Sequence, residues 1–206
     1  MTNRAVVAAP NALESEDWID LFNGRDLDGW AVKMGSSKFA VENGEIVGRI
    51  VPGSPSTFLC TTETFDDFEL IFEVKKSGDT NSGVQIRSLI RDGAKQPSDG
   101  VVHGPQVDIG RPGLTGFLFG ESANLGWING EPTPHNHFKN GEWNQFRVLA
   151  KGPRIQTWIN GEPVEDCSRA DVYSEYPRGF IGLQLHRQAN VSESSEVRFR
   201  KIRLRR

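Results

Sequence analysis

The chain has 206 residues, with 24 Lys and Arg against 27 Asp and Glu, and its formal net charge is -3. This balance lacks the strongly basic surface of a nucleic-acid-binding protein. No apolar run approaches the roughly 20 residues that a membrane-spanning helix needs, and residues 5–9 are too short for the apolar region of a secretion signal. We therefore expect neither nucleic acid nor a membrane as a partner, and either a cytoplasmic protein or one whose signal has been removed.

The length suits one substantial core, and all-β sandwiches of this size are commonly single domains. We expect residues 1–16 to form a flexible leader and residues 17–206 to form one domain. The two cysteines, Cys60 and Cys167, are far apart and have no metal-ligand spacing. One disulfide is an option, but two buried thiols are favoured because a chain of this length needs no covalent staple.

Short strands separated by turns are predicted along the whole chain. Asn-Gly dipeptides at 43–44 and 160–161 are typical of two-residue hairpin turns, and the apolar parity changes near 200–201, which predicts a β-bulge. Long loops are expected at 91–103 and 121–141. The expected strands are residues 18–22, 39–41, 46–48, 68–75, 82–90, 104–110, 115–120, 144–151, 154–159, 179–186 and the C-terminal segment. Roughly a dozen strands without a long amphipathic helix predict a two-sheet sandwich with a curved, polar-lined face.

The strand at 104–110 is the centre of the predicted site. Its polar residues alternate with apolar ones, and the strands at 82–90 and 179–186 repeat that pattern. If the three strands share a sheet, one face carries Gln85, Arg87, Gln106, Asp108, Gln184 and His186. An ordinary solvent-facing sheet alternates in the same way. However, amides, Arg, Asp and His are more directional groups than the Lys, Glu and Thr of common wet faces, which favours a polar ligand site.

The ordered set of short motifs resembles one known family. Residues 21–30, Leu-Phe-Asn-Gly-Arg-Asp-Leu-Asp-Gly-Trp, look like the opening signature of the 3-keto-disaccharide hydrolase domain. The segments at 81–84, 141–144, 158–161, 179–184 and 199–202 follow in the order of that family. The resemblance extends from about residue 17 to the C-terminus.

The resemblance implies a concanavalin A-like jelly roll, in which two antiparallel sheets present a concave face to carbohydrate. It also implies hydrolysis of glycosides already oxidised at C3 of the sugar, commonly by proteins exported to the periplasm or beyond. Some family members only bind sugar.

The central strand has a faint likeness to the Glu-x-Asp-x-Glu strand of jelly-roll retaining glucanases. Such enzymes need two carboxyl groups about 5 Å apart, but Gln106 and Gly110 stand at the two Glu positions. A 3-keto sugar offers another route, because the ketone acidifies the C2 proton. Loss of that proton gives an enolate that expels the group at C1, and water then adds to the enone.

The candidate residues take the following expected roles. Asp108 or His186 is the base, without a decision between them, and Arg87 stabilises charge on the C3 oxygen. Trp127 is a candidate for stacking on the sugar ring. The predicted substrate-binding residues are Gln85, Gln106, Gln184, Trp127 and His103. No metal site and no cofactor are expected.

Two other functions stay open at this point. One is a carbohydrate-binding module of the same fold without a working base. The other is a sandwich domain for protein contacts, in which the polar face is ordinary surface. A shielded pair of Asp108 and His186 would favour catalysis, whereas a flat open face would favour either alternative.

Overall fold

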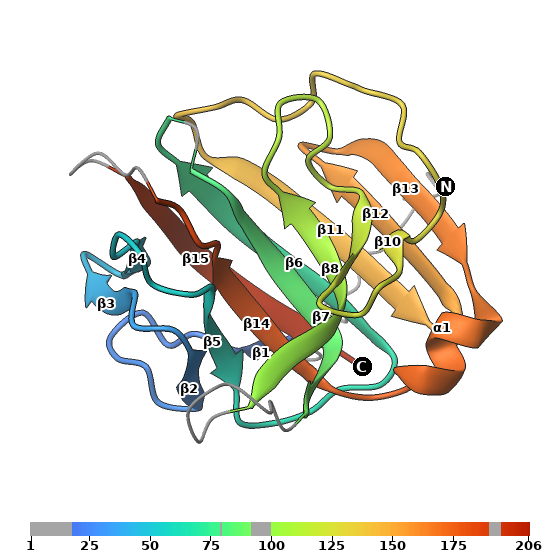
Figure 1. Cartoon of the computed structure of the whole chain (residues 1–206), viewed down its shortest axis with the longest axis horizontal. Helices are drawn as coiled ribbons and strands as arrows, with labels where there is room; N and C mark the ends of the chain where they lie inside the picture. The colour runs from blue at the N-terminus through green and yellow to red at the C-terminus, as the bar shows by residue number, and fades with distance from the viewer. Residues whose placement is uncertain (1–17, 79, 92–99, 190–194) are drawn as a thin grey trace, which may run out of the picture.

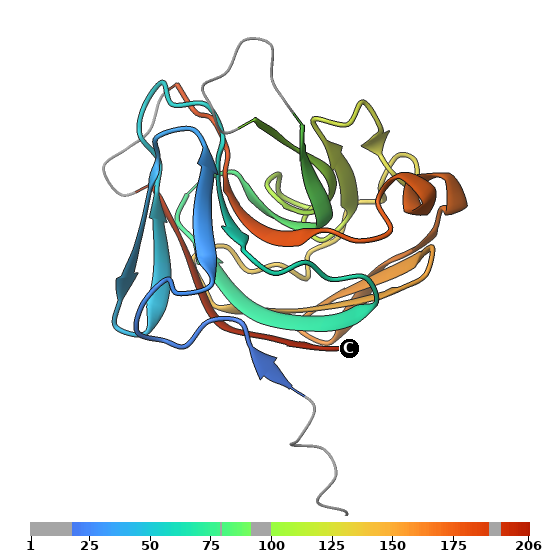
Figure 2. The same ribbon diagram turned by 90° about the horizontal axis from the view of Figure 1, so that it is seen from below.

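Figure 1 shows the computed structural model of the chain, which describes residues 18–78, 80–91, 100–189 and 195–206. The expected leader, residues 1–16, lies outside the described residues. Two antiparallel sheets are stacked, as the view in Figure 2 makes clear. The predicted two-sheet antiparallel jelly-roll sandwich is therefore confirmed.

The sheets are named here by their relation to the site. The back sheet has the order β13 (Glu162–Ser168), β12 (Arg154–Ile159), β11 (Asn144–Lys151), β6 (Phe68–Lys76), β15 (Glu196–Arg205), β4 (Glu45–Arg49) and β3 (Lys38–Glu42), and β1 (Ile19–Asp20) pairs with β15. The front sheet has the order β10 (Gly126–Trp127), β9 (Leu118–Glu121), β8 (Val101–Ile109), β7 (Ser82–Arg91), β14 (Phe180–Leu185), β5 (Thr57–Thr61) and β2 (Trp30–Met34).

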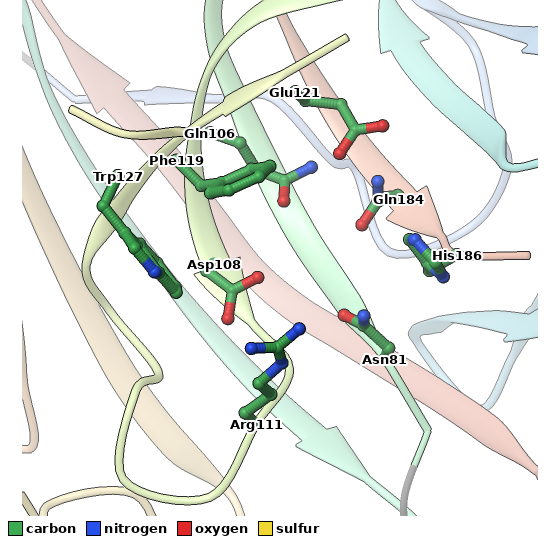
Figure 3. Close-up of a pocket in the computed structure, with 9 residues that line it drawn as sticks. All are labelled: Asn81, Gln106, Asp108, Arg111, Phe119, Glu121, Trp127, Gln184 and His186. Atoms are coloured by element: carbon green, nitrogen blue, oxygen red, sulfur yellow. The ribbon is translucent and has the colours of Figure 1, made fainter. Parts of the chain in front are cut away.

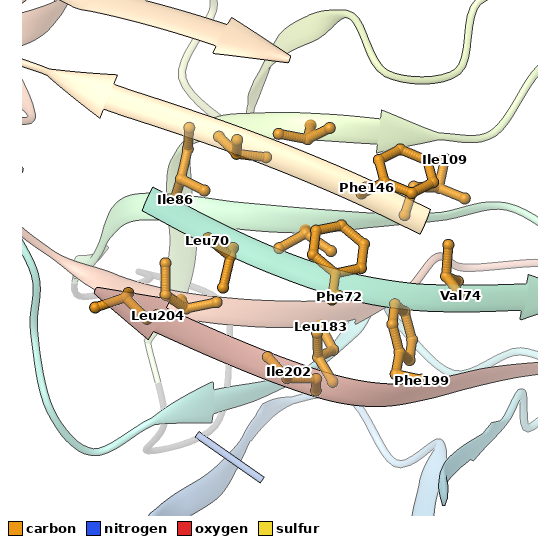
Figure 4. Packing of buried hydrophobic residues seen from close by; sticks show 14 of the residues in the cluster. Leu70, Phe72, Val74, Ile86, Ile109, Phe146, Leu183, Phe199, Ile202 and Leu204 are labelled. Atoms are coloured by element: carbon orange, nitrogen blue, oxygen red, sulfur yellow. The ribbon is translucent and has the colours of Figure 1, made fainter. Parts of the chain in front are cut away.

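The hydrophobic core lies between the sheets because one parity of each central strand is apolar. On β6 the buried and partly exposed residues alternate without a break, as a sheet with one wet face requires. Phe72 of β6 stacks on its cross-strand neighbour Phe146, with ring centroids 4.9 Å apart. Ile86, Ile109 and Leu183 close the core from the front sheet (Figure 4). Burial of each such side chain contributes roughly 1.5–3 kcal/mol.

The predicted turns and bulge are confirmed. Asn43 joins β3 to β4 and Asn160 joins β12 to β13, and both adopt positive φ, as does the Gly that follows each of them. The register of β15 against β6 shifts between Arg200 and Arg203, where Lys201 has a φ of 51°. Cys60 and Cys167 are both free and buried, so the favoured pair of thiols is also confirmed.

Some boundaries differ from the expectation. β8 begins at Val101, inside the stretch expected to be a loop, and residues 92–99 of that stretch lie outside the described residues. The expected loop at 121–141 contains the short strand β10. A short helix, α1 (Ala170–Glu175), was not predicted. No helix in the described ranges is long and apolar enough to cross a membrane.

Candidate functional site

The strand register brings the central polar residues into one row. Asp108 on β8 is opposite Gly83 on β7, and Gly83 is opposite Gln184 on β14. Residues directly opposite each other on an antiparallel pair share a face. Asp108 and Gln184 therefore flank a glycine, and the missing side chain leaves a hollow between them.

A cleft opens over this row of residues and extends toward β9 and β10 (Figure 3). Its empty volume is about 530 Å³, counted to the open mouth. The residues that line it are Asn81, Gln106, Asp108, Arg111, Phe119, Glu121, Trp127, Gln184 and His186. Of the eight residues predicted for the site, the fold brings five to this cleft: Gln106, Asp108, Gln184, His186 and Trp127.

The polar face of the front sheet is shielded from solvent, unlike an ordinary wet face. Gln106 and Gln184 are each only 1% exposed. Nε2 of Gln106 and both amide atoms of Gln184 have no hydrogen-bond partner in the described part of the protein. Because buried amide groups without partners are costly, these atoms remain available to hydrogen-bond with water or with a polar ligand.

The glycine in the hollow also sets the position of Gln106. A Cβ atom built on Gly83 would lie 2.3 Å from Cδ of Gln106, so the Gln106 side chain crosses the backbone of β7 at this point. No other residue type leaves that space, because every other one has a Cβ. Gly83 thus allows the Gln106 amide to lie between Asp108 and Gln184.

Asp108 is the carboxylate in this row that pairs across to Gly83, and it is only partly exposed. Burial raises the pKa of Asp108 to about 6. The Gly110 N–H donates to Oδ2 at 3.0 Å, and this bond opposes the rise, as do the charges of Arg111 and Lys76, whereas Glu121 reinforces it. A carboxyl group with such a pKa is a stronger base than a free one and is still ionised at neutral pH.

His186 follows β14 and faces the same cleft (Figure 3). Its Nδ1 lies 2.9 Å from the carbonyl oxygen of Arg187. A carbonyl oxygen can only accept, so Nδ1 carries the proton and the other ring nitrogen, Nε2, is an acceptor in the neutral imidazole. The backbone N–H of His186 donates to the Asn81 carbonyl at 3.2 Å, which ties the residue to the start of β7.

Two aromatic rings form one wall of the cleft. Trp127 and Phe119 are cross-strand neighbours, with ring centroids 5.2 Å apart in an edge-to-face arrangement. Phe119 is in turn opposite Gln106. An aromatic wall beside polar amides is suited to a pyranose, which has an apolar ring face and polar edges.

Arg87 does not line the cleft. The pairing of β7 with β8 shifts between Gln85 and Leu89, and Arg87 adopts a φ of 48°, so the alternation that placed it on the polar face ends there. Its guanidinium is buried, donates to the carbonyls of Asp66 and Gly152, and pairs with Asp67 at 2.9 Å. Arg87 instead connects the two sheets at one end of the sandwich.

Gln85 and His103 also lie outside the cleft. Gln85 is opposite Gln106 on the polar face of the sheet, but it is fully buried, and its Nε2 donates to Ser88 Oγ at 3.2 Å. His103 lies near the opposite end of β8, where its Nδ1 is 2.9 Å from the hydroxyl of Tyr176. Neither side chain lines the cleft.

Four cleft residues were not predicted: Asn81, Arg111, Phe119 and Glu121. Phe119 and Glu121 have the parity of β9 that continues the polar face, and this signal was available in the sequence. Arg111 lies in the turn after β8, where no periodicity applies. Its guanidinium points toward the Asp108 carboxylate (Figure 3).

Comparison with known families gives a match over nearly the whole chain. The family model described as 3-keto-alpha-glucoside-1,2-lyase-like domain matches residues 17–205. This confirms the resemblance to the 3-keto-disaccharide hydrolase domain. Among the curated proteins there is no match.

Several solved structures share the fold. A candidate glycosyl hydrolase from Parabacteroides distasonis has a TM-score of 0.64 at 21% identity, with 92% of this chain and 94% of that one covered. The carbohydrate-binding module CBM66 from Bacillus subtilis has a TM-score of 0.58 at 15% identity, with 86% and 96% covered. The exoplasmic domain of VIP36, bound to Ca²⁺ and Man3GlcNAc, has a TM-score of 0.58 at 10% identity, with 93% and 89% covered. At these identities the likeness concerns the fold alone.

Proposed function

The chain belongs to the 3-keto-alpha-glucoside-1,2-lyase-like domain family, and on that premise we propose that it cleaves 3-keto-glycosides in the cleft by elimination and hydration. This glycosyl hydrolase-like or carbohydrate-binding jelly-roll domain has a cleft whose polar groups and aromatic wall suit a sugar. The observation that carries the proposal is the carboxylate of Asp108 beside the two unpartnered amides of Gln106 and Gln184.

Asp108 is the base in this proposal. The C3 ketone makes the C2 proton acidic, and a carboxylate whose pKa is about 6 can accept that proton at neutral pH. His186 in its protonated form gives a proton to the leaving-group oxygen through Nε2. Its Nδ1–H is already engaged by the Arg187 carbonyl, which holds the ring in this orientation.

Arg111 takes the role that the sequence suggested for Arg87. As C2 loses its proton, negative charge moves to the C3 oxygen, and the guanidinium of Arg111 is the arginine group that lines the cleft. The amides of Gln106 and Gln184 hold sugar hydroxyls, and Trp127 covers the ring face.

The steps balance without another reagent. The C2–H bond breaks with its proton passing to Asp108, the C2=C3 enolate re-forms the ketone, and the C1–O bond breaks as the leaving alcohol takes a proton from His186. Water then adds across C1=C2: it gives a proton to neutral His186 as its hydroxide joins C1, and Asp108 returns its proton to C2, so both residues regain their starting protonation states. The products are the free 3-keto sugar and the alcohol.

The test is product release from a panel of 3-keto-glucosides and their unoxidised parents, followed by mass spectrometry. The wild type is compared with Asp108→Asn and His186→Ala. We expect turnover of the keto substrates alone, a loss of at least about 10³-fold in Asp108→Asn, and a loss of about 10²-fold in His186→Ala. Full activity in Asp108→Asn would show that Asp108 is not the base.

A non-catalytic carbohydrate-binding module is the second candidate. The amide-rich floor of the cleft favours it, since Gln106 and Gln184 bind hydroxyls without any chemistry. No turnover of any substrate, together with saturable sugar binding that is lost in Trp127→Ala, would establish this function in place of the enzyme.

A further inference from the structure

The cleft does not end at Asp108. A second open hollow adjoins the cleft and shares Asn81, Arg111 and His186 with it. This hollow is also lined by Pro112 and Arg187. Its empty volume is about 700 Å³, counted to its open mouth. We call this continuation the basic groove, and it is open space directly beside the cleft.

The charges of the basic groove have one sign. Arg111 and Arg187 line it, and no carboxylate of the described chain does so. Neither arginine forms an ion pair with a described residue, whereas Arg49, Arg154 and Arg198 pair with carboxylates at other sites. Glu121 and Asp108, the acidic groups of the site, lie on the cleft side.

The backbone that carries Arg187 is held in place, although its side chain is exposed. The N–H of Arg187 donates to Ser56 Oγ at 3.1 Å, and the N–H of Gly53 donates to the carbonyl of the next residue, Gln188. The guanidinium therefore starts from a fixed point at the rim. Asn81 adds an amide where the groove meets the cleft.

From this arrangement we propose that the basic groove binds an oxyanion, such as a carboxylate or a sulfate ester, on the leaving group of the glycoside. The inference rests on the proposed function, because it takes the sugar ring to occupy the cleft. The guanidinium groups of the two arginines that line the groove can recognise an oxyanion by paired hydrogen bonds. The protein thus discriminates among 3-keto-glycosides by the charge of the departing group.

The test uses two substrates that differ only in charge: the 3-keto-glucosides of 4-hydroxybenzoate and of 4-hydroxybenzamide. Wild type is compared with Arg187→Gln, which lies outside the catalytic set, and with Arg25→Gln, an exposed arginine of the β1–β2 loop that removes the same charge elsewhere. The ratio of kcat/KM for the two substrates is the measured quantity. Differences in leaving-group chemistry cancel when that ratio is compared between variants.

We expect the carboxylate to be favoured in the wild type and in Arg25→Gln, with the ratio falling about threefold to tenfold in Arg187→Gln. Added salt should lower the wild-type preference, because exposed charges are screened. An unchanged ratio in Arg187→Gln would overturn the inference. The 4-sulfophenyl analogue separates a site that accepts any oxyanion from one that requires a planar carboxylate.

A binding measurement separates this inference from the proposed function. The unoxidised glucosides of the same two phenols are titrated calorimetrically against the three proteins. If the charged glucoside binds more tightly in an Arg187-dependent way but no keto substrate is turned over, the oxyanion site is supported and the proposed enzyme activity is rejected. Turnover of both keto substrates without a charge preference would support the enzyme activity and reject the oxyanion site. Absence of both binding and turnover would reject both proposals.

Discussion

Gln106 crosses the backbone of β7 at Gly83, where an added Cβ would lie 2.3 Å from Cδ of the glutamine. The two residues are on neighbouring strands, and the row that contains Gly83 also contains Asp108 and Gln184. A single missing side chain therefore shapes the floor of the cleft. This relationship predicts that adding one methyl group at Gly83 strongly affects sugar binding or turnover.

Gly83→Ala should displace the Gln106 amide and lower sugar binding or kcat/KM by about 10-fold or more, since the new methyl group cannot share that space. The measurement is a double-mutant cycle with Gln106→Ala. If the effect acts through Gln106, the double variant is no worse than Gln106→Ala alone. Additive losses would show that Gly83 matters for another reason. Gly182→Ala, whose Cβ would be 3.2 Å from Cys60 Sγ, is the milder control on the same face.

The pH dependence of turnover should follow Asp108. Burial raises its pKa to about 6, and the base acts only in its ionised form. We expect the limb of the kcat/KM profile that rises with pH to have its midpoint near pH 6, because Asp108 must be ionised. Arg111→Gln removes a nearby positive charge that lowers this pKa, so the rising limb should move to higher pH. If the rising limb does not move in Arg111→Gln, the limb reports the titration of a group other than Asp108.

Stability should change with pH in the opposite sense. The pKa of Asp108 is about 6 in the folded protein against a reference value of 3.8, so between these values the folded state binds more protons than the unfolded state. The contribution of Asp108 to the free energy of unfolding therefore falls as pH rises through this window. Asp108→Asn removes the ionised group.

We expect Asp108→Asn to be more stable than the wild type by roughly 1–2 kcal/mol at pH 8, allowing for screening of a partly exposed carboxyl. The two proteins should have similar stabilities near pH 4. Urea unfolding at both pH values measures the difference. A variant that is less stable than the wild type at pH 8 would show that the Asp108 carboxylate stabilises the fold.

Arg87 should affect stability and not chemistry. Arg87→Gln leaves the carbonyls of Asp66 and Gly152 without the guanidinium that donates to them, and we expect a loss of about 2–4 kcal/mol in the free energy of unfolding. Arg154→Gln is the matched control, because its pair with Asp166 is exposed on both sides and such pairs contribute at most about 1 kcal/mol. If Arg87→Gln has normal stability but no longer turns over substrate, Arg87 has a role in the reaction.

Local patterns were sufficient for most of the strands and for part of the lining of the cleft. Alternation placed Gln106, Asp108, Gln184 and His186 on one face of their strands, and the Asn-Gly turns at residues 43 and 160 defined two hairpins. These features depend on neighbours in the chain, because side-chain parity and turn conformation are local properties. They hold whatever the strands later pair with.

Tertiary structure decided the rest. The bulge that turns Arg87 away from the polar face arises from the pairing of β7 with its neighbours, so parity counted along β7 alone cannot detect it. The space that Gly83 leaves for Gln106, and the position of Arg111 beside Asp108, likewise depend on which strands and turns become neighbours. The sequence by itself determined which residues were available to one face, and long-range strand pairing determined which of them form the cleft.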